Sequence, residues 1–225
     1  MPSLERQTIV SFAQFIVFAA LLLFLPAWTL AYWQAWLFLA VFMLSSILTT
    51  IYVWRKDPAL LERRLRGGPT AEKEPIQRVI QTFASITILA LFVFPAIDHR
   101  FHWSDVPVSA VLVAEVVIAF GFYLIYLVFK ENSYSAATVE IAPGQSVVST
   151  GPYAIVRHPM YSSALLLIFA MPIALGSWWG LLLFPPFAAV IVWRLWEEEK
   201  FLVNRLPGYA AYQKKVPYRL LPLIW

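Results

Sequence analysis

The stretch Thr8–Trp28, TIVSFAQFIVFAALLLFLPAW, contains no charged side chain. A helix needs about 20 mostly apolar residues to cross the hydrocarbon core of a bilayer, and this run meets that length. It is too long for the apolar part of a signal peptide, and no small-x-small cleavage site precedes the next apolar run. We therefore predict a retained membrane-spanning helix.

Further apolar runs of similar length follow along the chain. The last apolar run is the longest, and Pro and Gly residues interrupt it. It is too long for one helix and too short for two full spans, so a tight helical hairpin is expected there. The sequence predicts an all-α fold, a polytopic integral membrane helical bundle with five to six transmembrane helices. The further apolar runs are Tyr32–Trp54, Ile76–Ile97, Val106–Phe129 and Met160–Trp193.

The composition supports this fold and excludes several kinds of chemistry. Of the 225 residues, 60% are hydrophobic and 13% charged, whereas roughly 25% are charged in a soluble domain. The absence of cysteine excludes disulfides, thiol catalysis and cysteine-ligated zinc, and three histidines are too few for a multi-histidine metal centre. No metal is therefore expected. Neither GxGxxG nor GxxxxGK[ST] occurs, so a nucleotide-like cofactor would need another kind of site.

The positive charges predict the orientation in the membrane. Seven of the 17 Lys and Arg residues lie in Arg55–Arg78 and six lie from Arg194 onward, whereas only Arg100 falls in the loop 98–106. Six crossings then place 16 of the 17 on one side, and the positive-inside rule makes that side cytoplasmic. Both termini and the active site are thus expected in the cytoplasm. The net charge of +4 indicates contact with anionic membrane lipid, and no nucleic acid partner is expected.

We treat residues 1–225 as a single membrane domain. Residues 1–130 are expected to form four transmembrane helices, with a cytoplasmic amphipathic helix within 55–75 that ends at Gly67-Gly68-Pro69. Residues 131–225 are expected to form a polar, cofactor-binding connector, the helical hairpin and an amphipathic C-terminal tail from Arg194 onward.

The stretch Gly151–Tyr161, GPYAIVRHPMY, is the first candidate for a functional site. Taken alone, its Pro would start a helix and its Arg and Tyr would be interface anchors. However, Glu197–Glu199 follow the last apolar run, where a helix end would disfavour acids, which suggests a positively charged ligand such as an ammonium or sulfonium group. Ionisable groups at membrane depth indicate function. The residues expected to converge are Arg157, His158, Tyr161, Arg194 and Glu198.

Two other polar features are interpreted as structural. Asp98-His99-x-x-His102-x-x-Asp105 has metal-like donors, but on a short outer loop it is expected to be a solvated turn. Glu115 lies inside the fourth span, where a charge is costly in lipid, so it is expected to face other helices, with no role assigned.

Four segments carry a resemblance to a known family. The string Gln145–Tyr161, the pattern Arg194-x-x-x-Glu198-Glu199, Pro207-Gly-Tyr-x-x-Tyr212 and Val216–Pro222 resemble the isoprenylcysteine carboxyl methyltransferase family. The same C-terminal pattern is similar to membrane phospholipid N-methyltransferases. The resemblance covers about Thr138–Trp225, and Asp57–Arg66 also matches bacterial members.

The resemblance implies that S-adenosylmethionine binds without a Rossmann fold and that Arg194 binds and orients the acceptor. The catalytic residues would be Arg194, Glu198 and His158. Gln145 and Met160 stand where eukaryotic members have His and Ser. The implied cofactor-binding residues are Gln145, Val148, Tyr153, Arg157, His158, Pro159, Met160, Tyr161 and Glu198.

The predicted reaction is methyl transfer from S-adenosylmethionine to a lipophilic small-molecule or prenylated acceptor, first of all the carboxylate of an isoprenylcysteine-like substrate. A carboxylate needs only orientation, as by Arg194. A phospholipid amine, the first alternative, needs a base such as Glu198 or His158. The second alternative is an NADPH-dependent enzyme like the membrane sterol reductases, whose endings resemble Val216–Trp225 but which usually lack the Glu-Glu pair. A transporter is disfavoured because the polar residues gather at one membrane edge.

Overall fold

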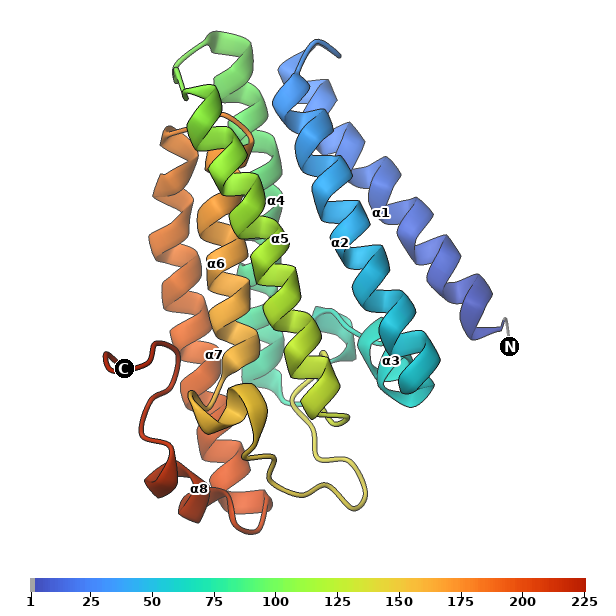
Figure 1. The fold of residues 1–225 in the computed structure, drawn as a ribbon, viewed down its shortest axis with the longest axis vertical. Coiled ribbons are helices and arrows are strands. Elements are labelled where there is room, and N and C mark those ends of the chain that lie inside the picture. The colour runs from blue at the N-terminus through green and yellow to red at the C-terminus, as the bar shows by residue number, and fades with distance from the viewer. Residues whose placement is uncertain (1–2) are drawn as a thin grey trace.

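The computed structural model describes residues 3–225, and in this part of the chain helices and loops occur without strands. The all-α prediction is therefore confirmed. Six long helices form the bundle shown in Figure 1. They are α1 (Leu4–Ala27), α2 (Trp33–Lys56), α4 (Pro75–Phe101), α5 (Val108–Glu131), α6 (Pro159–Ala174) and α7 (Phe184–Arg205). The short helices are α3 (Pro58–Leu65) and α8 (Tyr209–Lys215), with 3₁₀ turns at Pro69–Ala71, Gly151–Ala154 and Trp179–Leu183.

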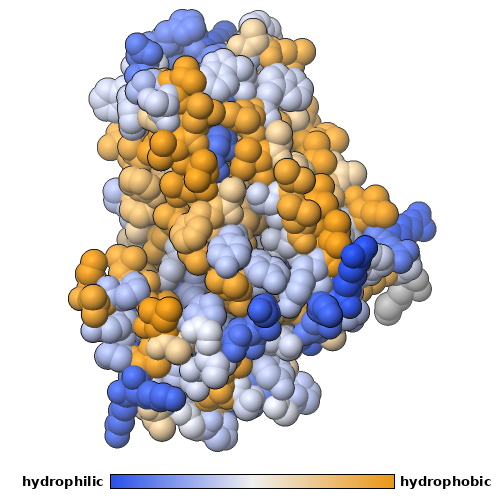
Figure 2. All heavy atoms as spheres, viewed as in Figure 1, coloured by the Kyte–Doolittle hydropathy of each residue, from blue (hydrophilic) through white to orange (hydrophobic). Residues whose placement is uncertain are grey.

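The long helices have the length and composition of membrane spans. Helices α1, α2, α4 and α5, and the segment Trp179–Arg205, are long and apolar enough to cross a bilayer, whereas α6 is a shorter apolar helix of 16 residues. Hydrophobic side chains cover the middle of the bundle in Figure 2, with hydrophilic groups toward both ends. The protein is thus an integral membrane protein, and the expected five to six spans are confirmed.

The hairpin between α6 and α7 depends on two glycines. Gly176 follows the end of α6 with a φ of +75°, which favours glycine. A Cβ at Gly180 would lie 2.7 Å from the Cβ of Pro172, so only glycine permits this close approach. The predicted hairpin is therefore confirmed, with a turn in the place where the sequence interrupts the apolar run.

Helix α7 continues beyond the predicted end of the apolar run. It ends at Arg205, twelve residues after Trp193, so the C-terminal tail begins later than predicted. Glu197–Glu199 lie six to eight residues before this end, whereas the helix dipole acts only within the last turn. The dipole argument for a cationic ligand is therefore wrong. Within the helix, Glu197 pairs with Lys200 at 2.7 Å.

The helix predicted in segment 55–75 is present as α3. Asp57 caps it by accepting a hydrogen bond from the Leu60 backbone N–H at 2.9 Å, and Leu60 and Leu61 pack against Val53 of α2. The helix ends just before the predicted stop at Gly67. Its place at the lipid interface stays a prediction.

The end of the bundle opposite to α3 and α8 is tied by a buried carboxylate. Asp98, at the end of α4, is 1% exposed and accepts hydrogen bonds from the Ser104 backbone N–H at 2.8 Å and from the Ser177 hydroxyl. The expectation of a solvated turn is thus wrong for Asp98, which joins α4 to the hairpin turn. Glu115 is buried as expected, and neither carboxylate oxygen has a hydrogen-bond partner among residues 3–225.

Candidate functional site

The polar connector between α5 and α6 is held against the bundle by side chains of α3 and α4 and of the loop between them. The Arg64 guanidinium of α3 donates to the Ala136 carbonyl at 3.0 Å, and the Gln81 amide of α4 donates to the Ala137 carbonyl at 3.1 Å. An ion pair of 3.1 Å joins Lys73 to Glu140. A segment without regular structure thereby becomes one wall of a site.

A cavity of about 490 Å³ lies between this connector and helices α4 to α8. The volume is within the range of roughly 300–1,000 Å³ typical of small-molecule sites. One side is polar and is formed by the connector, whereas the other is formed by apolar side chains of the spans. These apolar residues are Ala84, Ile88, Ile125, Leu167, Phe187 and Ile191.

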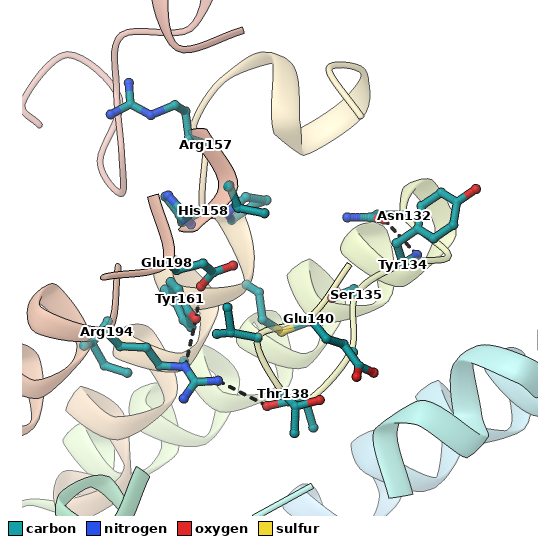
Figure 3. A pocket seen from close by; sticks show the side chains of 18 of the residues that line it. Asn132, Tyr134, Ser135, Thr138, Glu140, Arg157, His158, Tyr161, Arg194 and Glu198 are labelled. Carbon is teal, nitrogen blue, oxygen red and sulfur yellow. Dashed lines mark hydrogen bonds between the residues drawn. The ribbon is translucent and has the colours of Figure 1, made fainter. Parts of the chain in front are cut away.

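Every residue that the sequence predicted for the site lines this cavity, and several are labelled in Figure 3. Their placement in one cavity agrees with the expected convergence, while their roles stay predictions. Gln145 has a structural contact as well, because its side-chain oxygen accepts from the Ala142 backbone N–H at 2.9 Å. The ten lining residues are Gln145, Val148, Tyr153, Arg157, His158, Pro159, Met160, Tyr161, Arg194 and Glu198.

Glu198 presents a negative charge to the cavity. Its half-buried carboxylate accepts a hydrogen bond from the Tyr161 hydroxyl, and no Lys, Arg or His within residues 3–225 lies within ion-pair distance of it. The two side chains point toward each other in Figure 3. Glu198 is therefore free to pair with a positively charged ligand.

Arg194, one helical turn before Glu198, is held on two of its three nitrogens. Its Nε donates to the Tyr161 hydroxyl at 2.9 Å, and Nη2 donates to Glu72 Oε1 at 2.8 Å and to the Ala137 carbonyl at 3.2 Å. The buried Nη1 has no hydrogen-bond partner in the described part of the chain. Two of the three nitrogens of Arg194 are therefore occupied by the protein itself, and the third is buried without a partner among the described residues.

Arg157 is held by Glu199 and by the C-terminal tail. Its Nε donates to Glu199 Oε1 at 2.7 Å, and the ring Nε2 of His158 lies 3.2 Å from the same oxygen. Arg219 donates to the other oxygen of Glu199 at 3.1 Å. In Figure 3 the Arg157 guanidinium points away from Glu198, and it also donates to the carbonyls of residues 216 and 217 at 2.8 and 2.9 Å. Its contacts indicate that Arg157 holds the site together.

The C-terminal tail encloses the turn that precedes α6. The backbone N–H groups of Arg157 and His158 donate to the carbonyls of Tyr218 and Arg219 at 2.9 and 3.0 Å. The Tyr212 hydroxyl donates to the Tyr153 carbonyl at 2.7 Å. These contacts explain why the motifs at 151–161 and 207–222 occur together, since each positions the other.

Tyrosines form much of the polar wall. The Tyr153 hydroxyl accepts from the Asn132 amide at 2.8 Å, and burial raises the pKa of Tyr153 to about 12. Burial, with the carboxylates of Glu198 and Glu199 nearby, also raises the pKa of Tyr209, whose buried hydroxyl has no partner among the described residues. These phenols stay neutral at physiological pH. Neutral aromatic rings beside a carboxylate suit a cationic ligand.

Sequence reasoning missed three residues that organise the site. Glu72 is completely buried beside Arg194, Glu199 joins Arg157 to Arg219, and Tyr209 carries an unpartnered hydroxyl on the cavity wall. The resemblance had pointed to Glu199 and Tyr209 as motif positions without a role. Nothing in the polar segment around Glu72 marks it as buried.

Residues 109–207 match the family model described as phospholipid methyltransferase. The match runs from the beginning of α5 to just past the end of α7, and it includes all ten predicted site residues. No curated protein matches the chain. The family match supports a membrane methyltransferase of the same broad group as the enzymes expected from the sequence. It does not confirm the isoprenylcysteine carboxyl methyltransferase family.

Proposed function

We propose that this integral membrane protein transfers a methyl group from S-adenosylmethionine to an acceptor carried by a lipid. The observation that carries the proposal is the Glu198 carboxylate, which faces a cavity that is polar on one side and apolar on the other and has no Lys, Arg or His within ion-pair distance among residues 3–225. A sulfonium group beside Glu198 would form the ion pair that this carboxylate does not make with the described residues. The match of residues 109–207 to phospholipid methyltransferases supports the same chemistry.

The residues present fit this cofactor. Glu198 and the rings of Tyr153 and Tyr161 provide negative charge and aromatic faces for a sulfonium. The unpartnered Tyr209 hydroxyl and the polar connector offer hydrogen-bonding groups for the remainder of the cofactor. The residues predicted to contact the cofactor at Gln145, Val148 and 157–161 line the same cavity.

The cofactor supplies a methyl group on a positively charged sulfur, and the acceptor atom displaces that sulfur in line, so that one bond to the methyl carbon forms as the other breaks. The protein need not form a covalent intermediate. Its contribution is alignment and the exclusion of water, and alignment alone supplies ~7–11 kcal/mol in favourable cases. In this proposal Glu198 holds the cation, Arg194 Nη1 donates to the acceptor, and the connector covers the reacting atoms.

The apolar side of the cavity favours a lipophilic acceptor that enters sideways from the bilayer, while the cofactor enters from the cytoplasm. A carboxylate, as in an isoprenylcysteine-like substrate, is our first candidate. It is supported by Arg194, whose Nη1 has two protons to donate and no partner among the described residues. A carboxylate is already a nucleophile and needs no base.

The amine of a phospholipid is the second candidate, and the family match favours it. A protonated amine must lose a proton before it attacks, so a base is needed. Glu198 is the available carboxylate, because the ring nitrogen Nε2 of His158 is already at 3.2 Å from Glu199.

Purified protein in lipid nanodiscs tests the proposal. With methyl-labelled S-adenosylmethionine we expect label in either an isoprenylcysteine analogue or phosphatidylethanolamine, and the labelled product decides between ester and amine. Calorimetric titration should show binding of S-adenosylhomocysteine and not of NADPH. Binding of NADPH alone would replace the proposal by the reductase alternative, which shares the tail motif.

A further inference from the structure

We infer that Glu72 is a positioning residue that fixes the guanidinium of Arg194 for the acceptor. This inference rests on the proposed function. Glu72 lies in the loop before α4, outside the family match and 122 positions from Arg194 in sequence. It does not line the cavity, so it acts on a ligand only through other residues.

The carboxylate of Glu72 is held from three separate parts of the chain. Oε1 accepts from Arg194 Nη2 at 2.8 Å and from the Gln81 amide at 2.9 Å, and Oε2 accepts from the Val139 backbone N–H at 3.2 Å. The residue is 1% exposed. A buried carboxylate is tolerated when it is paired and hydrogen-bonded on both oxygens, as it is here.

These contacts determine which part of Arg194 a ligand can meet. Nη2 is occupied by Glu72 and Ala137, and Nε by Tyr161, so the plane of the guanidinium is fixed at two nitrogens. Any rotation that offered a different nitrogen to the cavity would break at least one of these bonds. Nη1 is buried and has no partner among the described residues, and in this inference it is the donor for the acceptor head group.

Glu72 also links the acceptor side of the site to the connector. The Val139 N–H is bonded to Glu72, and the neighbouring Ala137 carbonyl accepts from both Arg194 and Gln81. The connector keeps other attachments, including the Arg64 hydrogen bond to Ala136. Loss of Glu72 should therefore disturb Arg194 more than the cofactor side of the cavity.

The test uses Glu72→Gln, which removes the charge, and Glu72→Asp, which keeps the charge and shortens the side chain. The matched control is Glu74→Gln, because Glu74 lies two residues away and does not line the cavity. Among the described residues its carboxylate forms an ion pair only with the exposed Arg205, at 3.5 Å. We expect kcat to fall at least tenfold in both Glu72 variants, with the Kd of S-adenosylhomocysteine within threefold. The Glu74 variant should behave like the parent protein.

A double-mutant cycle with Arg194→Lys shows whether Glu72 acts through Arg194. If it does, adding Glu72→Asp to the lysine variant should change kcat by less than twofold. The inference would be overturned if the kcat losses of the two single variants multiplied in the double variant. It would also be overturned by an unchanged kcat in both Glu72 variants, or by a loss of cofactor binding parallel to the loss of kcat. If Glu72→Gln does not fold, Glu72→Asp carries the test. Absence of methyl transfer in the parent protein would instead refute the proposed function.

Discussion

The charge of Glu198 provides the sharpest test of the site. Glu198→Gln keeps nearly the same shape and leaves an oxygen that can accept from the Tyr161 hydroxyl. It removes the one negative charge that faces the cavity without an ion pair in the described part of the chain. The variant should therefore report the interaction between that charge and a cation, with little change in packing.

The size of the effect follows from Coulomb's law. Two unit charges about 4 Å apart attract by about 4 kcal/mol at an effective dielectric constant of about 20. Glu198 is half-buried, so solvent screens part of this energy. Retaining a third to a half leaves ~1.4–2 kcal/mol, which raises the Kd of S-adenosylmethionine about 10- to 30-fold. S-adenosylhomocysteine has no charge on sulfur, so its Kd should rise less than about threefold.

Calorimetric titration of each purified variant with both ligands measures this difference. Glu197→Gln is the matched control, because the neighbouring Glu197 pairs with Lys200 and does not line the cavity. It should leave both dissociation constants unchanged. If Glu198→Gln weakened the two ligands equally, or neither of them, Glu198 would not pair with the sulfonium and the central observation of the proposed function would fail.

Three other expectations test different parts of the protein. Arg194→Lys should lower turnover about 10- to 100-fold, which corresponds to ~1.4–2.7 kcal/mol of transition-state stabilisation, because one ammonium cannot replace the contacts to Tyr161 and Glu72. The Kd of the cofactor should stay within about threefold, and a parallel loss of cofactor binding and turnover would contradict this role. Asp98→Asn should lower the free energy of unfolding by ~1.5–3 kcal/mol, measured as a lower melting temperature in detergent with normal turnover per folded molecule. An unchanged melting temperature would show that Asp98 does not stabilise the contact between α4 and the hairpin turn. A reporter fused after residue 225 should be active only in the cytoplasm, and periplasmic activity would reverse the topology.

The spans were predictable because a bilayer sets the length of an apolar helix, so composition alone locates them. The end of α7 was not predictable in this way. Charges after Trp193 look like an exit from the membrane, but Glu199 is buried against Arg157 and Arg219, and these partners lie 42 and 20 positions away in the sequence. A hydropathy profile cannot reveal ion pairs between residues so far apart in the sequence.

The convergence of residues on one cavity was predictable where they belong to short motifs, as at 157–161 and at Arg194 and Glu198. The three acids that sequence reasoning treated as one group have three different environments. Glu197 pairs with Lys200, Glu198 faces the cavity, and Glu199 joins the tail to the turn before α6. Their separation follows from helical geometry, since successive residues point about 100° apart, and from partners that only the folded chain brings near.

The backbone hydrogen bonds between residues 157–158 and 218–219 have a consequence for biogenesis. All helices of the bundle precede residue 206 and can enter the membrane as they are synthesised, but the turn before α6 gains these bonds only after the ribosome has passed residue 219. Contacts between segments so far apart in sequence form late. A nascent chain that has already inserted every span therefore still lacks the finished cavity, so the protein should become able to bind a ligand there only after the tail has been synthesised.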